Sequence, residues 1–475
     1  MERPEDVGDL LELDAETMRE LGYRVVDVLV ERIAGLGEEP VWRGASRAEL
    51  ESRLAGAAPE EGRPFDSLLD RLLADVLPFM YSTDHPRFFA YIPGCPTWPS
   101  VLGDLIAGGF NVFQGTWPAG AGANVVELVV LDWFRDWIGY PPQAGGLLVS
   151  GGSEANLTAL ACARAVRLGE HFDDAVVYLS SQTHSSVERA ARVLGFRAGR
   201  IRTIEVDDGY RMRLDALAAA IDEDERAGLR PLFVAANAGA TNSGAVDPIP
   251  GLAAFCAERG LWLHVDGAYG GFATLTERGR RWLAGIELAD SVTLDPHKWL
   301  YQPWGTGSLL VREGGLLEEA FHVMPDYLQD ARARGREVSF ADRGIQLTRP
   351  ARALKIWLSV QFFGLAAFRG AIDRTLDLAV RAQDRVERSP AFELLSPATL
   401  GIVCFRRALP GAGEEEHERG NAALVRALAE SGAGFVSSTR LAGRYAIRLC
   451  VENHRSGAED VERVLAWLES APIPG

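Results

Sequence analysis

Cysteine is scarce in this chain, and its five cysteines lie far apart in the sequence. They are odd in number and form no Cys-x-x-Cys pair, which argues against a disulfide framework and against a thiolate zinc site. No apolar stretch is free of charge for long enough to cross a bilayer, and the acidic first residues lack the features of a signal peptide. These absences predict a cytoplasmic protein without a membrane segment.

Positive charge is also in short supply. The chain has 49 basic and 66 acidic residues, hence a net charge of −17, and no segment forms a basic stripe. This composition argues against nucleic acid and against anionic membranes as partners. An acidic protein can still hold a locally positive pocket, so a small anionic ligand remains compatible with the sequence.

Several motifs of common ligand sites are missing as well. The turns between the expected strands and helices contain neither the Gly-x-Gly-x-x-Gly of dinucleotide-binding folds nor the P-loop pattern Gly-x-x-x-x-Gly-Lys-Ser/Thr. The chain has no His-Glu-x-x-His and no cluster of His, Asp and Glu with the spacing of metal ligands. The sequence therefore predicts no resident metal.

What the chain does contain is a regular alternation of strands and helices. Strands are expected at 147–150, 175–180, 200–206, 231–236, 261–266, 291–295 and 306–311. Helical patterns lie between most of them, which predicts an α/β fold with a mostly parallel sheet and helices on both faces. In such sheets, ligands bind beyond the carboxyl ends of the strands, so the residues after each strand are the candidates for chemistry.

The texture of the sequence divides the chain into three parts. Residues 1–81 have helical spacing and too few apolar residues for a core of their own, which predicts an arm that packs on the rest of the chain or on a partner subunit. Residues 82–350 form the expected large domain. Residues 351–475 combine helices with short strands and are expected to form a small α+β domain.

A lysine follows the strand at 291–295, in the sequence Asp295-Pro296-His297-Lys298-Trp299-Leu300. Its neighbours are a rigid proline, an imidazole and an indole, which indicates a lysine at the mouth of a pocket. Burial would lower the pKa of Lys298, as a lysine that forms a Schiff base requires. The hexapeptide alone is equally compatible with a lysine at a strand end whose ammonium group reaches into solvent.

Other strand ends carry further polar groups. Gly152 and Ser153 open a helix, where free N–H groups bind anions, although a plain glycine turn with a serine cap has the same pattern. His184 lies between a strand and a helix, either as a structural residue or as a group that stacks or moves a proton. Thr241 lies in a loop of small residues, and Asp266 ends an apolar strand, where its carboxylate needs a partner.

Together these groups match one cofactor better than any of them does alone. An anion cradle, a flat imidazole, a carboxylate and a lysine stand at successive strand ends of one sheet. Pyridoxal phosphate requires a phosphate site, a partner for its pyridinium nitrogen and a lysine for its aldehyde.

The sequence also resembles a known family, the group II pyridoxal-phosphate-dependent amino acid decarboxylases, nearest the aromatic-L-amino-acid decarboxylase branch. The matching stretches occur in the same order over nearly the whole chain. They are His85-Pro86 with Phe88-Phe89-Ala90-Tyr91, Gly152-Ser153-Glu154-Ala155, 184–190, 262–269, Pro296-His297-Lys298-Trp299 and 352–357.

This resemblance implies fold type I, the aspartate-aminotransferase type, and a homodimer with the active site at its interface. Lys298 would form the Schiff base, Asp266 would protonate the pyridine nitrogen, and His184 would stack on the ring above Ala268. Thr241 would lie near the phenolic oxygen of the ring. The phosphate would be bound by Gly152, Ser153, Ser291 and His297. The side chain of the substrate would contact Tyr91, Ile92 and Phe113, the last from the other subunit.

The implied reaction is decarboxylation of an L-amino acid, expected to be aromatic, to the amine and CO2 through a quinonoid intermediate. Two positions depart from the family. Counting back from Lys355 without gaps puts Phe340 where the decarboxylases have a proton-donating loop tyrosine, and Asp295 stands where the animal enzymes have asparagine. Asp295 is expected to weaken phosphate binding.

Because of Phe340, the sequence does not decide whether the product is an amine or an aldehyde. Related plant enzymes with phenylalanine at this place consume oxygen and form aldehyde, ammonia and hydrogen peroxide. Tyr327 lies nearby, and His184 is a second candidate proton donor, so amine formation is the preferred hypothesis and aldehyde formation the alternative. A transaminase and a non-catalytic homologue that binds the cofactor are further hypotheses, against which the set of Lys298, Asp266 and His184 argues.

Overall fold

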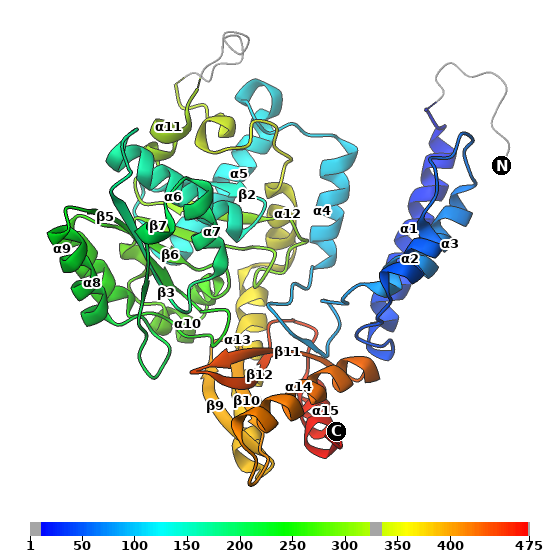
Figure 1. Ribbon diagram of the computed structural model, residues 1–475. Coiled ribbons are helices and arrows are strands. Elements are labelled where there is room, and N and C mark those ends of the chain that lie inside the picture. Colours follow the sequence, from blue (N-terminus) through cyan, green and yellow to red (C-terminus); the bar gives the residue numbers. More distant parts are fainter. Residues whose placement is uncertain (1–10, 324–334, 474–475) are drawn as a thin grey trace.

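A seven-stranded sheet forms the centre of the computed structural model, which describes residues 11–323 and 335–473 (Figure 1). Its strand order is β2-β8-β7-β6-β5-β3-β4. The bounds are Gly145–Val149 (β2), Ala175–Ser180 (β3), Ile201–Ile204 (β4), Arg230–Asn237 (β5), Trp262–Asp266 (β6), Ser291–Leu294 (β7) and Gly307–Val311 (β8). All seven strands were expected from the sequence, within a few residues at each end.

The sheet is parallel except at β8, which runs antiparallel to both of its neighbours, β2 and β7. The prediction of a mostly parallel sheet is therefore confirmed. In the register of the central strands, Asp266 lies opposite Asn237 on one side and Thr293 on the other. The last residues of β5, β6 and β7 thus meet at one edge of the sheet, and β2 and β3 end at the same edge.

Helices cover both faces because right-handed crossovers place them according to the direction in which the chain moves along the sheet. The chain moves outward through α6 (Gly152–Leu168) and α7 (Ser185–Val193) and returns through α8 (Leu214–Arg226) and α9 (Ile249–Arg259). The other helices of this region are α4 (Trp98–Gly109), α5 (Trp117–Ile138), α10 (Glu277–Trp282), α11 (Gly315–Phe321) and α12 (Ala353–Phe363). The strands between them are almost wholly buried, as a sheet that is covered on both faces must be.

A second sheet of five strands lies at the C-terminal end, in the order β1-β11-β12-β10-β9. Its bounds are Phe88–Phe89 (β1), Phe392–Thr399 (β9), Ile402–Arg407 (β10), Phe435–Leu441 (β11) and Arg444–Cys450 (β12). The helices of this part are α13 (Leu365–Arg388), α14 (Glu414–Ser431) and α15 (Ala458–Ser470). Because β1 pairs with β11, Phe88 and Phe89 belong to the small sheet, which corrects their expected place in the large domain.

Three helices at the N-terminal end stand apart from the rest of the molecule in Figure 1. They are α1 (Ala15–Gly35), α2 (Arg47–Leu54) and α3 (Phe65–Asp75). The N-caps follow the sequence, because Asp14 accepts hydrogen bonds from the first turn of α1 and Ser46 forms a capping box with Glu49. No residue of α1 is buried, so this helix contributes almost nothing to the core of its own chain.

Neither a membrane-spanning helix nor a metal site is found among the described residues. Within residues 11–323 and 335–473, no helix is both long and apolar enough to cross a membrane. The same residues contain no group of three or more His, Cys, Asp and Glu side chains arranged to hold a metal ion.

Candidate active site

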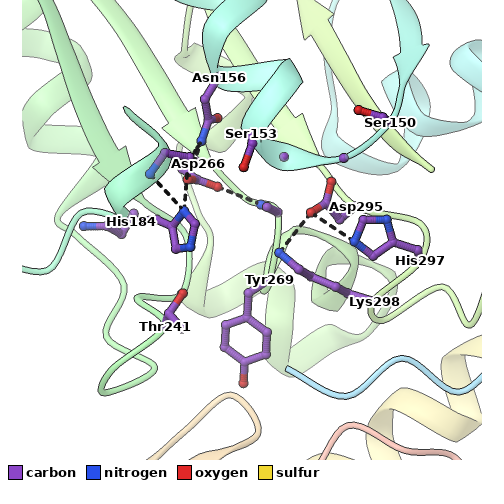
Figure 2. Close-up of a pocket in the computed structure, with 16 residues that line it drawn as sticks. Ser150, Ser153, Asn156, His184, Thr241, Asp266, Tyr269, Asp295, His297 and Lys298 are labelled. Atoms are coloured by element: carbon purple, nitrogen blue, oxygen red, sulfur yellow. Dashed lines mark hydrogen bonds and ion pairs between the residues drawn. The ribbon is translucent and has the colours of Figure 1, made fainter. Parts of the chain in front are cut away.

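A cavity of about 280 Å³ opens at the edge of the large sheet where β2, β3, β5, β6 and β7 end (Figure 2). Its walls come from these strand ends and from the first turns of α6 and α7. The lining residues are Ser150, Gly151, Gly152, Ser153, Asn156, His184, Ser186, Asn237, Gly239, Thr241, Asp266, Ala268, Tyr269, Asp295, His297 and Lys298. The structure thus brings eight of the residues expected at the site into one pocket.

Lys298 extends into this pocket from the turn between β7 and β8. Its Nζ lies 2.9 Å from Oδ2 of Asp295, and Nε2 of His297 lies 3.6 Å from the same oxygen. Burial lowers the pKa of Lys298, but the carboxylates of Asp295, Asp266 and Glu452 raise it more, so the pKa lies above its ordinary value. The expectation of a lowered pKa is wrong because it counted burial and left out the carboxylates.

The start of α6 forms a cradle that only glycine can build. A Cβ on Gly152 would lie 2.9 Å from Oδ2 of Asp295 and 3.0 Å from Cβ of Ala268, and a Cβ on Gly307 would lie 2.5 Å from Cα of Gly151. The backbone therefore comes close to the pocket, with the free N–H groups of a helix N-terminus facing it. This arrangement, together with the Ser153 hydroxyl, suits an anion such as a phosphate group.

Asp266 lies deeper in the pocket, and its two oxygens are held by different donors. Oδ2 accepts a hydrogen bond of 2.9 Å from Nδ2 of Asn156, and Oδ1 accepts one of 3.1 Å from the backbone N–H of Ala268. A carboxylate that is fixed in this way can accept a further proton donor from the cavity, such as a protonated ring nitrogen. Figure 2 shows the carboxylate beside Asn156 and His184.

Behind Asn156 lies a row of buried donors that all point toward Asp266. Nε1 of Trp262 donates to Oγ of Ser291, which hydrogen-bonds Nδ1 of His264, each at 2.8 Å. Nε2 of His264 then lies 3.0 Å from Oδ1 of Asn156. Burial lowers the pKa of His264 to about 4, so the ring is neutral and carries its proton on one nitrogen only.

This row corrects the expected role of Ser291. The residue begins β7, whereas the pocket lies at the other end of that strand. Its hydroxyl is fully buried and bound to Trp262 and His264, so it cannot reach a phosphate group in the cavity. Ser291 instead supports Asp266 from behind through two intermediate side chains.

His184 caps the N-terminus of α7 and faces the pocket. Its Nδ1 accepts a hydrogen bond of 3.3 Å from the backbone N–H of Ser186, and the Ser186 hydroxyl lies 2.8 Å from the same nitrogen. Because Nδ1 is an acceptor, the proton of the neutral ring resides on Nε2. Burial lowers the pKa of His184, and the attraction of the carboxylates of Asp266 and Asp295 only partly offsets this effect.

Thr241 reaches the pocket from the loop after β5, and a buried arginine fixes that loop. Nε of Arg448 donates to the carbonyl of Thr241 and Nη1 donates to the carbonyl of Tyr91, both at 2.6 Å. Tyr91 itself has a φ of +54°, a left-handed conformation that is strained for a residue with a side chain. The arginine therefore ties a wall of the pocket to the aromatic segment in front of it.

The residues expected to contact the substrate are not part of this cavity. Ile92 is buried in the main core, and the ring of Tyr91 is half exposed and packs near Phe435. Phe113 is partly exposed and pairs with Pro350 in an isolated bridge. Their role, including the contribution of Phe113 from a second subunit, stays a prediction.

Phe340 does not face the pocket. The residue begins a short 3₁₀ helix (η7, Phe340–Arg343), and its ring is fully buried. The guanidinium groups of Arg349 and Arg343 lie 4.8 Å and 5.6 Å from the centre of this ring. The ungapped count from Lys355 therefore placed a core residue at a functional position, and Tyr327, the other candidate, lies outside the described residues.

Comparison with known proteins decides the family. A family model described as the pyridoxal-dependent decarboxylase conserved domain matches residues 48–408. The chain belongs to this family. It is a pyridoxal-phosphate-dependent amino acid decarboxylase of fold type I, as the resemblance had implied.

Individual relatives cover almost the whole chain. An aromatic-L-amino-acid decarboxylase of Bacillus atrophaeus is 42% identical over 467 residues, which are 98% of this chain and 97% of that protein. A phenylacetaldehyde synthase of Arabidopsis thaliana is 30% identical and covers 92% of each chain. The solved structure of Oryza sativa TDC with PLP and tryptamine superimposes with a TM-score of 0.92 at 29% identity, over 97% of this chain and 98% of that one.

The residues of the pocket fit pyridoxal phosphate. The glycine cradle at α6 leaves room for the phosphate group, Asp266 is held to receive the pyridinium N–H, and the amine of Lys298 lines the same pocket. The exception is Asp295, whose buried carboxylate stands beside the cradle with Oδ1 unpaired among the described residues. An asparagine there would offer a donor to the phosphate, which aspartate cannot do.

The sequence reasoning missed several residues of the pocket. Asn156 lies on the first turns of α6, where its amide links Asp266 to His264. A signal for it existed, since asparagine is unusual on the buried face of a helix whose other buried residues are mostly alanine and other small or apolar residues. Asn237, the last residue of β5, and Tyr269, three residues after β6, also line the cavity at the strand ends where functional side chains were expected.

Proposed function

We propose that the chain decarboxylates an aromatic L-amino acid to the corresponding amine and CO2. The observation that carries this proposal is the convergence of Lys298, Asp266 and the glycine cradle on one cavity. The bacterial relative that is 42% identical over almost the full length supports the aromatic substrate.

In this proposal, bound pyridoxal phosphate acts as the electron sink that accepts the electron pair left when CO2 departs. Lys298 would hold the cofactor through its aldehyde, and its amine would be free again while the amino group of the substrate occupies that place. Asp266 keeps the pyridine nitrogen protonated, and Asn156 and Ala268 hold its oxygens in place for this task. The cradle at α6 fixes the phosphate group and with it the position of the ring.

His184 is the proposed proton donor to the α-carbon. Its neutral ring carries a proton on Nε2, because Nδ1 accepts from the N–H of Ser186. Burial lowers the pKa of His184. An imidazolium formed there therefore gives up its proton readily. Phe340 cannot take this role from its place in the core.

The assembly is proposed to be a cytoplasmic homodimer, with the arm of residues 1–81, the large domain of residues 82–350 and the small domain of residues 351–475 in each copy. The exposed apolar side chains of the arm support a second copy as its partner; they include Met18, Tyr23, Val30, Leu54, Phe65, Leu68 and Leu72. The mass of the purified protein in solution, measured by light scattering, tests this assignment. A monomer would contradict it.

The product distinguishes the proposal from its alternatives. The protein is loaded with pyridoxal phosphate and incubated with phenylalanine, tyrosine, tryptophan and histidine, while CO2, amine, aldehyde and peroxide are measured together. We expect amine and CO2 in equal amounts, without peroxide, and no product from Lys298→Ala. Aldehyde and stoichiometric peroxide without amine would establish aldehyde formation, the product for which the Arabidopsis relative is named. A keto acid without CO2 would indicate a transaminase.

A further inference from the structure

The side-chain amide of Asn156 has a second partner besides Asp266. Its Nδ2 donates to Oδ2 of Asp266 and to Oγ of Ser186, both at 2.9 Å. The Ser186 hydroxyl in turn lies 2.8 Å from Nδ1 of His184. One amide group therefore joins a carboxylate and an imidazole that both line the cavity, and in Figure 2 Asn156 stands above these two groups.

The carboxylate of Asp266 fixes the orientation of this amide. A carboxylate only accepts hydrogen bonds, so Nδ2 of Asn156 must face Asp266 and Oδ1 must point the other way. Oδ1 accepts from Oγ1 of Thr293 at 2.8 Å and lies 3.0 Å from Nε2 of His264. Because two acceptors that face each other at this distance repel, Nε2 of His264 must carry the proton of its ring.

The far end of the row gives the same direction. The indole of Trp262 can only donate, and its Nε1 lies 2.8 Å from Oγ of Ser291. His264 is neutral because burial lowers its pKa to about 4, so its Nδ1 is an acceptor when Nε2 holds the proton. The hydroxyl of Ser291 therefore accepts from the indole and donates to Nδ1 of His264, at 2.8 Å. From Trp262 onward, each hydrogen bond in the row donates toward the pocket.

The branch through Ser186 extends this direction to His184. The backbone N–H of Ser186 donates to Nδ1 of His184 at 3.3 Å, so a proton on Nδ1 would face another N–H. Oγ of Ser186 already accepts from Asn156, and its own proton is left to donate to Nδ1. Ser186 is buried, so water has little access to these bonds. The proton of the neutral His184 ring is thereby kept on Nε2.

We propose that Ser186 is a positioning residue that holds His184 in the tautomer with its proton on Nε2, and that Asn156 orients the Ser186 hydroxyl for this task. The row behind the pocket then fixes two properties of the site through one amide group. It holds the carboxylate of Asp266 in place, and it decides which nitrogen of His184 bears the proton.

The role of Ser186 deepens the proposed function and rests on it, because it gives His184 the tautomer that a proton donor requires. With the proton on Nε2, the ring has an N–H on the side that Ser186 does not occupy. With the proton on Nδ1, that N–H would be directed at Ser186 instead. The tautomer can be measured on the ring itself without substrate, so this role can fail while the proposed reaction stands, and the reverse.

The experiment reads the tautomer from ¹⁵N chemical shifts, because a ring nitrogen that carries a proton differs from one that does not. The full chain is labelled with ¹⁵N-histidine and measured without cofactor at about pH 8, above the ordinary histidine pKa of about 6.5. His184→Gln identifies the signals of His184 among the eight histidines. We expect the proton on Nε2 in the wild-type chain, and a proton on Nδ1 there would overturn the proposal.

Ser186→Ala removes the hydroxyl group that donates to Nδ1. We expect the ratio of the Nε2–H to the Nδ1–H tautomer to fall about five-fold to ten-fold, as the loss of one hydrogen bond predicts. An unchanged ratio would contradict the role of Ser186. Ser186→Thr restores the hydroxyl and should restore the ratio, whereas a ratio as low as in Ser186→Ala would show that packing and not the hydroxyl is responsible.

The contribution of Asn156 is tested by a double-mutant cycle. Asn156→Ala leaves the Ser186 hydroxyl free to turn, so the tautomer ratio should fall although Nδ1 of His184 is bonded to Ser186 and not to Asn156. In a Ser186→Ala background, Asn156→Ala should change the ratio no further. An equal effect of Asn156→Ala in both backgrounds would overturn the coupling through Ser186.

A matched control separates this role from a general loosening of the pocket. Ser180, the last residue of β3, is also buried, and its hydroxyl lies 3.3 Å from Oγ1 of Thr183 and from Nδ2 of Asn237. Ser180→Ala should therefore leave the ¹⁵N shifts of His184 unchanged. A change as large as that in Ser186→Ala would contradict the proposal.

Discussion

Nδ2 of Asn156 lies 2.9 Å from Oδ2 of Asp266, and this one amide joins the carboxylate of the pocket to the interior of the sheet. The same side chain accepts from Oγ1 of Thr293 at 2.8 Å and lies 3.0 Å from Nε2 of His264. Each donor in the row therefore has its acceptor. Asn156, which holds Asp266, is itself fixed from behind by His264 and Thr293, which do not line the cavity. Such a row explains why the carboxylate can be buried without an ion pair.

Removal of this amide should weaken cofactor binding. Asn156→Ala leaves Oδ2 of Asp266 without its donor and leaves two buried donors, on Thr293 and His264, without an acceptor. We expect the dissociation constant of pyridoxal phosphate to rise about ten-fold, which corresponds to ~1.4 kcal/mol. A titration of the protein with the cofactor, followed by absorbance, measures this change.

A matched variant separates binding from stability in that experiment. Asn421 is also fully buried, but it hydrogen-bonds the backbone of Arg407 in the small domain. Asn421→Ala should lower the free energy of unfolding by about 1–3 kcal/mol and leave the affinity for the cofactor unchanged. Equal losses of affinity in both variants would show that Asn156 has no specific role.

The negative charge of Asp295 should weaken the binding of pyridoxal phosphate. Its carboxylate stands beside the cradle at Gly152, where a phosphate dianion is expected, and it holds Lys298 in its charged form through the 2.9 Å ion pair. Asp295→Asn removes both effects, so we expect affinity for pyridoxal phosphate to increase by about ten-fold at neutral pH. Asp136→Asn, a change on the exposed surface of α5, serves as the control. Weaker binding in Asp295→Asn would mean that the carboxylate organises the cradle.

The buried place of Phe340 gives a prediction about the product. Phe340→Tyr adds a hydroxyl group to a ring that is enclosed by the core and by Arg349 and does not line the pocket. We expect an unchanged ratio of amine to aldehyde and peroxide, together with a loss of stability of about 1–3 kcal/mol if the hydroxyl finds no partner. Phe134→Tyr, at another fully buried ring, is the control for stability. A shift of the product ratio in Phe340→Tyr alone would show that Phe340 does influence the reaction in the active site.

The site shows where sequence reasoning succeeds and where it fails. Asp266 ends its strand and His184 follows four residues after another, and both lie in the pocket as expected, because parallel strands bring their carboxyl ends to one edge. The phosphate-binding role predicted for Ser291 does not fit the structure, because Ser291 begins its strand and lies at the opposite edge of the sheet. The catalytic role predicted for Phe340 does not fit either, because a count along a loop says nothing about which way a side chain faces. Asn156 was missed because its partners, Asp266 and His264, are distant in sequence and meet it only in the folded chain.

The buried histidines predict the response of the fold to acid. Burial lowers the pKa of His85 and of His264 to about 4, below the value of 6.5 for an unfolded chain. Both side chains are fully buried, so the folded state keeps them neutral while the unfolded state takes up protons as the pH falls from 6.5 to 4. The stability that they contribute is complete above pH 6.5 and is lost through this window, with a slope of about 1.4 kcal/mol per pH unit for each histidine. Urea unfolding at several pH values measures the slope, and His264→Gln should flatten it by the share of one histidine. A free energy of unfolding that stays constant across the window in the wild-type chain would contradict the neutral state of the row behind Asp266.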